Sequence, residues 1–513
     1  MWFLVACVLA SAAVLCKETA LTALGLFVVE EALSLRRHQC WGGYKGAAVR
    51  LGLIGSLCGV YLRLKAGLTG VHFMPRIASV DNSAVNAPTP IAVVLSVLQI
   101  HSVYLSRLAV PITLSCDYSP NTLPNILSPW EPANLRWVCA YAILFVCLSY
   151  AVWRAVRRGD DFLVRASAWL IIPFGLSANV IFPVATVVGE RLLYLPSAGF
   201  CMALSWALTS PDSPVAGLVL ARHGRVPWTA VSVCALYFAR TVARVPVWHD
   251  TTHLFAVHAT SIVPKSIRMH HGLALELARQ GHHARALPAF RQALALLNDT
   301  SYRHGIRPSQ QAAELHGQYH FEAANSLSEL DMNEFPGARA EAQALYRAAV
   351  SLVPSEFKFH NRLAFNLVQQ RSYSDALGHF EACFLLRPTN ADMVNNIGNI
   401  YMATRRVELA LRAYTLGLRL NPADGDNLYN MGSLLLRFPE RTREAATALR
   451  RARRLIPADP EVGQALNHAL ALLHTQRREQ GHRSSTRHAD SQPAQGRSPG
   501  ARKKKSRQRK PTG

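Results

Sequence analysis

Hydrophobic residues divide the chain into two halves near residue 243. Before this point, long apolar runs alternate with short polar or basic segments, as in a membrane protein. After it, apolar residues recur at helical spacing among polar ones. The mean hydropathy of +0.10 averages these two patterns. A polytopic membrane domain followed by a soluble helical part explains the sequence better than one globular fold.

The first half contains a series of apolar segments: Trp2 to Cys16, Thr19 to Val29, Leu51 to Leu62, Ile91 to Leu114, Leu135 to Val152, Ala166 to Val188, Leu192 to Leu208 and Pro227 to Val242. The first resembles a signal peptide at Ala10-Ser11-Ala12, but it lacks a basic n-region and starts at Met1. We expect a chain that opens within a span, without its natural N-terminus.

Three basic loops follow apolar segments, and the positive-inside rule places them in the cytoplasm. They contain Arg36, Arg37, Lys45 and Arg50; Arg154, Arg157, Arg158 and Arg165; and Arg222 and Arg225. The segment Ile91 to Leu114 holds His101 and Arg107, so it is either a span or a re-entrant helix. If it does not cross, the three loops share one side, and Asp81, Asp117, Glu190 and the second half share the other.

Glu190 and Arg191 stand side by side between two apolar runs. A charge at the centre of a bilayer costs about 2.5–3.5 kcal/mol, so such residues usually face a polar cavity. We predict a tight luminal turn here, with Pro196 in the first turn of the next helix. In the functional interpretation the two charges border a polar site; in the alternative they form a local ion pair that only holds the turn.

The second half shows the period of a tetratricopeptide repeat, about 34 residues. Pro354, Pro388 and Pro422 are 34 residues apart, and the clearest copy runs from Ala391 to Asp424. We predict about five repeats over 267–478, with Glu461 to Gln476 as a capping helix, after a linker at 244–266. Each helix pair buries one face only by stacking on its neighbours. Such an array offers a concave face to a peptide or protein.

Several asparagines lie on the first helices of adjacent repeats: Asn395, Asn396, Asn399, Asn427 and Asn430. They are candidates for hydrogen bonds to the backbone of a bound acceptor; in the alternative they only cap and solvate the helices. Asn298-Asp299-Thr300 is a glycosylation sequon after the first repeat, which agrees with a luminal array.

The formal net charge of +23 is concentrated partly in the tail at 479–513, which is rich in Lys, Arg, Ser and Gly. This composition predicts disorder. A basic tail also suits a soluble nuclear adaptor, but behind several spans we expect a solvated tail and no nucleic acid. The cysteines lie mostly in apolar runs and form no CxxC pair, so we predict neither a metal site nor a cofactor.

Several motifs, in their order, resemble the transmembrane and tetratricopeptide-repeat family of protein O-mannosyltransferases. They are Cys16-Lys17-Glu18-Thr19, Leu105 to Pro111 with Asp117-Tyr118-Ser119, Glu190 to Ser197, and Trp248-His249-Asp250 with Leu254-Phe255. The resemblance implies an all-α fold: a C-type glycosyltransferase membrane domain, luminal repeats and a multi-pass location in the endoplasmic reticulum membrane. It also implies transfer of mannose from dolichyl phosphate mannose to Ser or Thr of cadherin-like proteins.

The family's catalytic acid pair sits in a first luminal loop, which lies ahead of the segment where this sequence begins. The catalytic base therefore stays unassigned, because Asp81, Asp117 and Glu190 have no counterpart in that pair. Our candidates for holding the donor phosphate or shaping the site are Arg191, Glu190, Lys17, Glu18, Arg107 and Asp117. The competing hypothesis is a non-catalytic membrane scaffold that binds luminal proteins through its repeats.

Overall fold

The computed structural model describes residues 21–37, 41–69, 82–116, 118, 122–180, 183–184, 186–214, 228–299, 310–331 and 333–489. These residues are helical or irregular, with no strand among them. Trp2 to Cys16, Lys17, Glu18, Asp81, Asp117 and the tail beyond residue 489 lie outside them. The chain forms two compact units, Met1–Phe359 and His360–Gly513.

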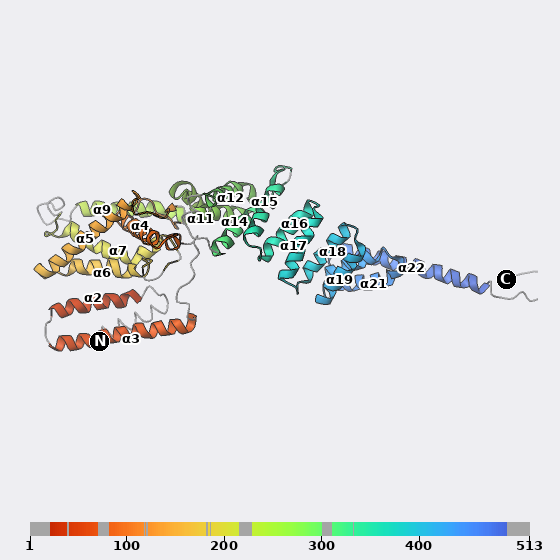
Figure 1. Cartoon of the computed structure of the whole chain (residues 1–513), viewed down its shortest axis with the longest axis horizontal. Helices are drawn as coiled ribbons and strands as arrows, with labels where there is room; N and C mark the ends of the chain where they lie inside the picture. Colours follow the sequence, from red (N-terminus) through yellow and green to blue (C-terminus); the bar gives the residue numbers. More distant parts are fainter. Residues whose placement is uncertain are drawn as a thin grey trace, which may run out of the picture. The chain divides into compact units, whose positions relative to one another are not determined.

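The first unit begins with the membrane helices (Figure 1). They are α2 (Thr22–Arg37), α3 (Trp41–Thr69), α4 (Pro90–Ala109), α5 (Asn134–Arg158), α6 (Phe162–Gly175), α7 (Tyr194–Thr209) and α9 (Trp228–Arg244), with the 3-10 helices η2 (Ala84–Asn86), η4 (Glu190–Leu193) and η5 (Val245–Trp248). Four stretches are long and apolar enough to cross a membrane: Pro90–Ala109, Asn134–Arg158, Glu190–Thr209 and Trp228–Trp248. The protein is therefore a membrane protein, as its sequence predicts.

The apolar run Ala166 to Val188 is helical only in its first part. α6 ends at Gly175, two residues after Pro173, which lacks the N–H that a continuing helix needs. The described residues between Gly175 and η4 are irregular, and η4 leads into α7, where Pro196 lies in the first turn as predicted. The interruption matters, because the irregular segment supplies the backbone groups that contact α4.

The chain enters and leaves α4 at the same end of the helical bundle. Before α4, Asn82 donates to the carbonyl of Thr186 at 3.1 Å. After α4, the N–H of Ser115 donates to Glu190 at 2.7 Å. Thr186 and Glu190 are four residues apart, so their Cα atoms lie at most about 15 Å from each other. The residues that they bind, Asn82 and Ser115, therefore lie near the same end of the bundle, whereas a bilayer core is about 30 Å thick. This packing agrees with the re-entrant alternative for Ile91 to Leu114.

Ion pairs join the first two basic loops at one end of the membrane helices. Arg36 lies 3.5 Å from Asp161, and Arg165 lies 2.9 Å from Glu30. In the same part of the bundle, the buried Arg154 pairs with Asp160 at 2.7 Å and with Asp212, beyond the end of α7, at 3.3 Å. Since α7 begins at Tyr194 and ends beside this cluster, residue 190 lies at the opposite end of the bundle.

Helices α6 and α7 cross at close range because Gly199 has no side chain. A Cβ atom there would lie 2.3 Å from the carbonyl oxygen of Ala166. Small residues permit such close approach between membrane helices. In contrast, α5 presents large apolar side chains outward, among them Leu135, Phe145 and Val146, as expected of a lipid-facing helix.

The segment between the membrane helices and the repeats is helical and packed. It contains η5, α10 (Thr251–Val257) and the π-helix η6 (His258–Ile262). Ala259 and Val263 share one hydrophobic core with Tyr104 of α4 and with Met269 of α11 (Ile267–Arg279), the first repeat helix. The first repeat is therefore anchored directly on the membrane helices.

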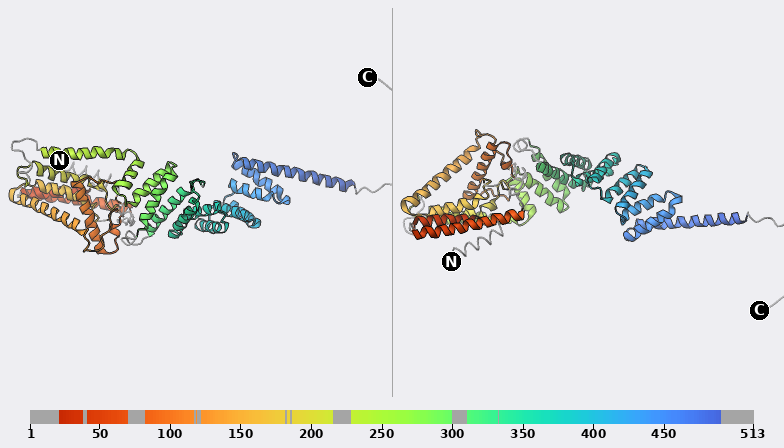
Figure 2. Two further views of the ribbon diagram at one scale, coloured as in Figure 1. Left: turned by 90° about the horizontal axis from the view of Figure 1, so that it is seen from above. Right: turned by 60° about the horizontal axis from the view of Figure 1, so that its bottom comes forward.

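The repeats form antiparallel helix pairs at the positions that the 34-residue period predicts (Figure 2). In the first unit these are α11 with α12 (His283–Leu297) and α14 (Gln310–Ser328) with α15 (Ala338–Leu352). α16 (Phe357–Gln369) begins at the boundary and pairs with α17 (Tyr373–Leu386). The second unit continues with α18 (Ala391–Ala403), α19 (Val407–Leu420), α20 (Gly425–Leu435), the 3-10 helix η7 (Pro439–Arg441), α21 (Thr442–Leu455) and α22 (Pro460–Ala489).

One alanine in the second helix of each pair is completely buried: Ala286, Ala342, Ala376, Ala410 and Ala445. Four of these pairs also bury an aromatic ring one turn later: Phe290, Tyr346, Phe380 and Tyr414. A small residue lets two helices approach closely, and the ring fills the groove beside it. The tetratricopeptide fold of this part of the chain is thus built as its sequence predicts.

We predict that Gly398→Ala loosens the fourth repeat. A Cβ at Gly398 would lie 2.5 Å from Cε1 of Tyr414, whereas a Cβ at Gly378 would meet nothing within 4 Å. Both substitutions gain about 1 kcal/mol of helix propensity, but overpacking costs about 1–3 kcal/mol. Hydrogen exchange in α18 and α19 should become about fivefold faster in Gly398→Ala. Equal exchange in the Gly398→Ala and Gly378→Ala variants would contradict this packing.

Candidate functional site

A cavity of about 640 Å³ lies at the end of the membrane helices opposite the ion-pair cluster. Its charged lining consists of four arginines and one glutamate: Arg107, Arg191, Arg240, Arg244 and Glu190. Tyr194, Tyr237 and Trp248 form its aromatic walls. We call this cavity the arginine pocket. Four positive charges against one negative charge make it a site for an anion.

The carboxylate of Glu190 fixes the loop that follows α4. Its Oε1 accepts the N–H of Ser115 at 2.7 Å and lies 2.7 Å from the hydroxyl of Tyr118. Glu190 and Arg191 make no salt bridge with each other among the described contacts, so the local ion pair of the alternative interpretation does not form.

The other side of the pocket comes from α9, whose arginines bind backbone carbonyls of the same loop. Arg240 donates to Pro111 at 3.2 Å and also to Ile112, and Arg244 donates to Leu114 at 2.7 Å. Carbonyl oxygens orient a guanidinium without neutralising its charge. The two arginines are therefore held in place with their positive charge still available.

Arg107 and Arg191 complete the lining. Arg107 donates to the hydroxyl of Thr113 and lies over the ring of Tyr118, with 5.8 Å from Cζ to the ring centre. Its Nε is buried without a hydrogen-bond partner among the described residues. Arg191 is exposed, and no described residue pairs with it. Both side chains retain donors for an anionic ligand.

An apolar cavity of about 770 Å³ opens beside the arginine pocket. It is lined mainly by apolar residues of α4, α5, α6 and α7, including Leu105, Ile143, Leu148 and Leu170. The two cavities share Arg107, Leu108 and Phe200. An apolar channel that meets a cluster of arginines suits an amphiphile with a long hydrocarbon chain and an anionic head group.

The structure thus brings together three of the predicted site residues, Glu190, Arg191 and Arg107, while Lys17, Glu18 and Asp117 lie outside the described residues. Arg240 and Arg244 were missed. Arg240 lies two residues before the end of the last predicted span, Pro227 to Val242, and Arg244 two residues after it, where basic residues normally flank a membrane helix. Their spacing of four residues, which puts both on one face of a helix, was the available signal.

Comparison with known proteins gives two family matches. Residues 72–145 match the family described as protein O-mannosyl-transferase TMTC, DUF1736, and residues 391–424 match the tetratricopeptide repeat. The first match contains Arg107 and the loop that Glu190 holds; the second coincides with the predicted copy Ala391 to Asp424. These matches support membership of the TMTC family.

The curated relatives that the chain matches are named protein O-mannosyl-transferases. Mouse TMTC4 is 29% identical over 321 residues, which cover 56% of this chain and 41% of the relative. Human TMTC4 is 26% identical over 313 residues, covering 56% and 40%. Human TMTC3 is 22% identical over 391 residues, covering 75% and 40%. The chain spans about two fifths of the length of these relatives.

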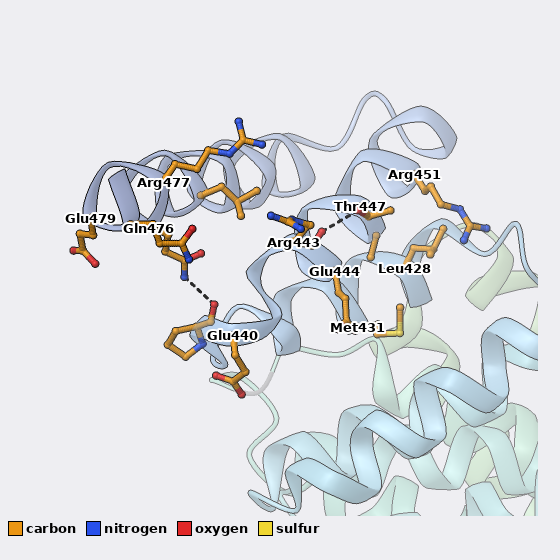
Figure 3. Close-up of a pocket in the computed structure, with 14 residues that line it drawn as sticks. Leu428, Met431, Glu440, Arg443, Glu444, Thr447, Arg451, Gln476, Arg477 and Glu479 are labelled. Carbon is orange, nitrogen blue, oxygen red and sulfur yellow. Dashed lines mark hydrogen bonds between the residues drawn. The ribbon is translucent and has the colours of Figure 1, made fainter. Parts of the chain in front are cut away.

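A third cavity, of about 890 Å³, lies in the second unit, between α21 and the long helix α22 (Figure 3). Leu428, Met431 and Leu473 give it an apolar surface. The side chains of Arg443 and Arg477 border it, and Gln476 donates to the carbonyl of Pro439 at 2.8 Å. We call this cavity the repeat groove.

The predicted acceptor-binding asparagines do not form one exposed surface. Asn430 donates to Asn395 at 3.0 Å across neighbouring repeats, and Asn399 accepts from Tyr414 at 2.7 Å. Asn396 is half-buried, whereas Asn427 is completely buried against Gly417. Asn427 is therefore out of reach of a bound peptide. Asn298 is exposed at the end of α12, and Thr300 of its sequon lies outside the described residues.

His258 lies behind the arginine pocket and is completely buried. Burial and the nearby charge of Arg244 lower its pKa to about 4. An unfolded chain has a His pKa of about 6.5 and binds more protons between these values, so stability should fall as the pH drops from 6.5 toward 4.

We therefore expect the apparent melting temperature of the detergent-solubilised chain to fall between pH 7 and pH 5. The fall should be smaller in His258→Gln, which removes the titrating group, and His253→Gln, at an exposed histidine, is the control. The same pH dependence in all three proteins would show that His258 titrates normally.

Proposed function

We propose that this chain forms part of a membrane-bound protein O-mannosyltransferase whose donor is dolichyl phosphate mannose. The observation that carries the proposal is the meeting of the arginine pocket and the apolar cavity at Arg107. The pocket matches the phosphate, and the cavity matches the start of an isoprenoid chain. The names of the TMTC relatives support mannose as the transferred sugar.

In such a transfer, a Ser or Thr hydroxyl attacks the anomeric carbon and dolichyl phosphate leaves. Negative charge builds up on the departing phosphate, and fixed guanidinium groups stabilise it. Arg240 and Arg244 are held by loop carbonyls, and Arg191 is free to approach the phosphate. Glu190 shapes the pocket through its two hydrogen bonds. We assign no residue of this chain as the base that accepts the hydroxyl proton.

We further propose that the pocket faces the lumen of the endoplasmic reticulum and that the repeats receive the acceptor protein there. The basic loops joined by ion pairs lie at the opposite end of the bundle, and basic loops normally stay in the cytoplasm. Cadherin-like acceptors are part of this proposal.

We predict that Arg191→Gln and Arg240→Gln each weaken binding of dolichyl phosphate mannose about tenfold. A hydrogen bond to a charged group contributes about 1.5–3 kcal/mol, and 1.4 kcal/mol corresponds to a factor of ten. Binding of radiolabelled donor to the chain in nanodiscs measures this. Arg157→Gln on the outside of α5 is the matched control.

Unchanged affinity in both pocket variants would refute the phosphate assignment. Donor binding without mannose transfer to a Ser/Thr peptide, under the same conditions, would show that this chain alone is not a transferase.

The second candidate function is a membrane-anchored scaffold, and the repeat groove favours it. The groove is large and partly apolar, and its charged lining consists of three arginines and three glutamates: Arg443, Arg451, Arg477, Glu440, Glu444 and Glu479. These features suit a protein segment that carries apolar side chains and charges of both signs.

We predict that Arg443→Glu combined with Arg477→Glu reduces capture of a bound partner several-fold, because it reverses two charges at the groove. Arg419→Glu, at an exposed site outside the groove, should leave capture unchanged. Affinity purification from cells with quantitative mass spectrometry measures this. If Arg191→Gln abolishes capture equally, the partner depends on the membrane pocket and the scaffold hypothesis fails.

A further inference from the structure

His258 occupies the point where three segments of the first unit meet. Its Nε2 contacts the guanidinium of Arg244 at the end of α9, and its Nδ1 lies 3.4 Å from Sγ of Cys116 in the loop after α4. Cys116 in turn lies 3.7 Å from Sδ of Met269 in α11. One buried imidazole therefore connects the arginine pocket, the loop and the first repeat.

The local backbone is built to place this imidazole. His258 is the first residue of the π-helix η6, and its carbonyl accepts the N–H of Val263 at 2.8 Å, a five-residue hydrogen bond. Single π-turns are uncommon and occur frequently at functional sites. The preceding helix is held close to the first repeat, since a Cβ at Gly272 would lie 2.8 Å from the ring of Phe255.

The contact with Arg244 fixes the protonation of the imidazole. A guanidinium has only donors, so Nε2 must accept and Nδ1 carries the proton toward the sulfur of Cys116. Arg244 then has two fixed acceptors, Nε2 of His258 and the carbonyl of Leu114 at 2.7 Å. Arg244 and Leu114 line the pocket, whereas His258 is not among its lining residues.

We propose that His258 is a positioning residue for the anionic head group: it holds Arg244 in the orientation that binds a lipid-linked phosphate. This proposal rests on the proposed function. It makes the segment that supports the first repeat a part of the donor site, because η6 supplies the acceptor that Arg244 needs. His258 itself does not touch the ligand.

The amide side chains of Gln and Asn replace different ring nitrogens of His258. Gln places its terminal amide near the position of Nε2 and can still accept from Arg244. Asn places its amide near Nδ1, so it faces Cys116 and does not reach Arg244. Asn is also one methylene smaller than Gln, so a packing role predicts a loss for Asn as well; that loss would add to the loss caused by Arg244→Gln, whereas a positioning role acts through Arg244 and does not add.

The experiment measures binding of dolichyl phosphate, which carries no sugar, to the full chain in nanodiscs. We expect His258→Asn to weaken binding about tenfold, as Arg244→Gln does, and His258→Gln to remain within about twofold of the unsubstituted chain. The double variant His258→Asn/Arg244→Gln should bind no more weakly than Arg244→Gln alone, because the two residues act through one contact.

Equal losses in the Gln and Asn variants, no loss in either, or additive losses in the double variant would each overturn the positioning role. If the unsubstituted chain binds dolichyl phosphate but transfers no mannose, the transferase proposal fails while the comparison of variants still decides the role of His258. If the unsubstituted chain does not bind dolichyl phosphate, the lipid-phosphate assignment and this inference both fail.

Discussion

The carboxylate of Glu190 is the constraint on which the arginine pocket depends. Four guanidinium groups in one partly buried cavity repel each other, and Glu190 is the one negative charge in its lining. By accepting from Ser115 and Tyr118, it also holds the loop whose carbonyls orient the arginines of α9. Glu190 therefore both balances the charge of the arginine pocket and fixes the geometry of the loop after α4.

At this end of the membrane domain, the arginine pocket meets both the apolar cavity and the segment that supports the first repeat. The apolar cavity leads from the bilayer region to Arg107, and the pocket continues to α9 and the packed segment beneath the first repeat. The charges at the other end, such as Arg154 with Asp160 and Asp212, are paired within the bundle.

Much of the fold follows from local sequence spacing. Ala410 and Tyr414 are recognisable because the repeat period fixes which residues face the neighbouring helix, and both are buried. Glu190 and Arg191 are recognisable because charges interrupt apolar runs. Arg240 and Arg244 are not recognisable as site residues, since arginines near the end of a span resemble ordinary flanking charges. Asn427 shows a further limit: the period assigns it to a helix, but its burial against Gly417 depends on how close the neighbouring helix comes.

The core that the first repeat shares with α4 limits how such proteins can change in evolution. Repeats that touch only their neighbours can be duplicated or lost with little effect on the rest of the chain. The first repeat cannot be exchanged in this way, because Met269 packs together with Tyr104, Val188 and Val263. We would therefore expect the length of the array to vary among relatives at its far end, while its first helix pair evolves together with the membrane helices.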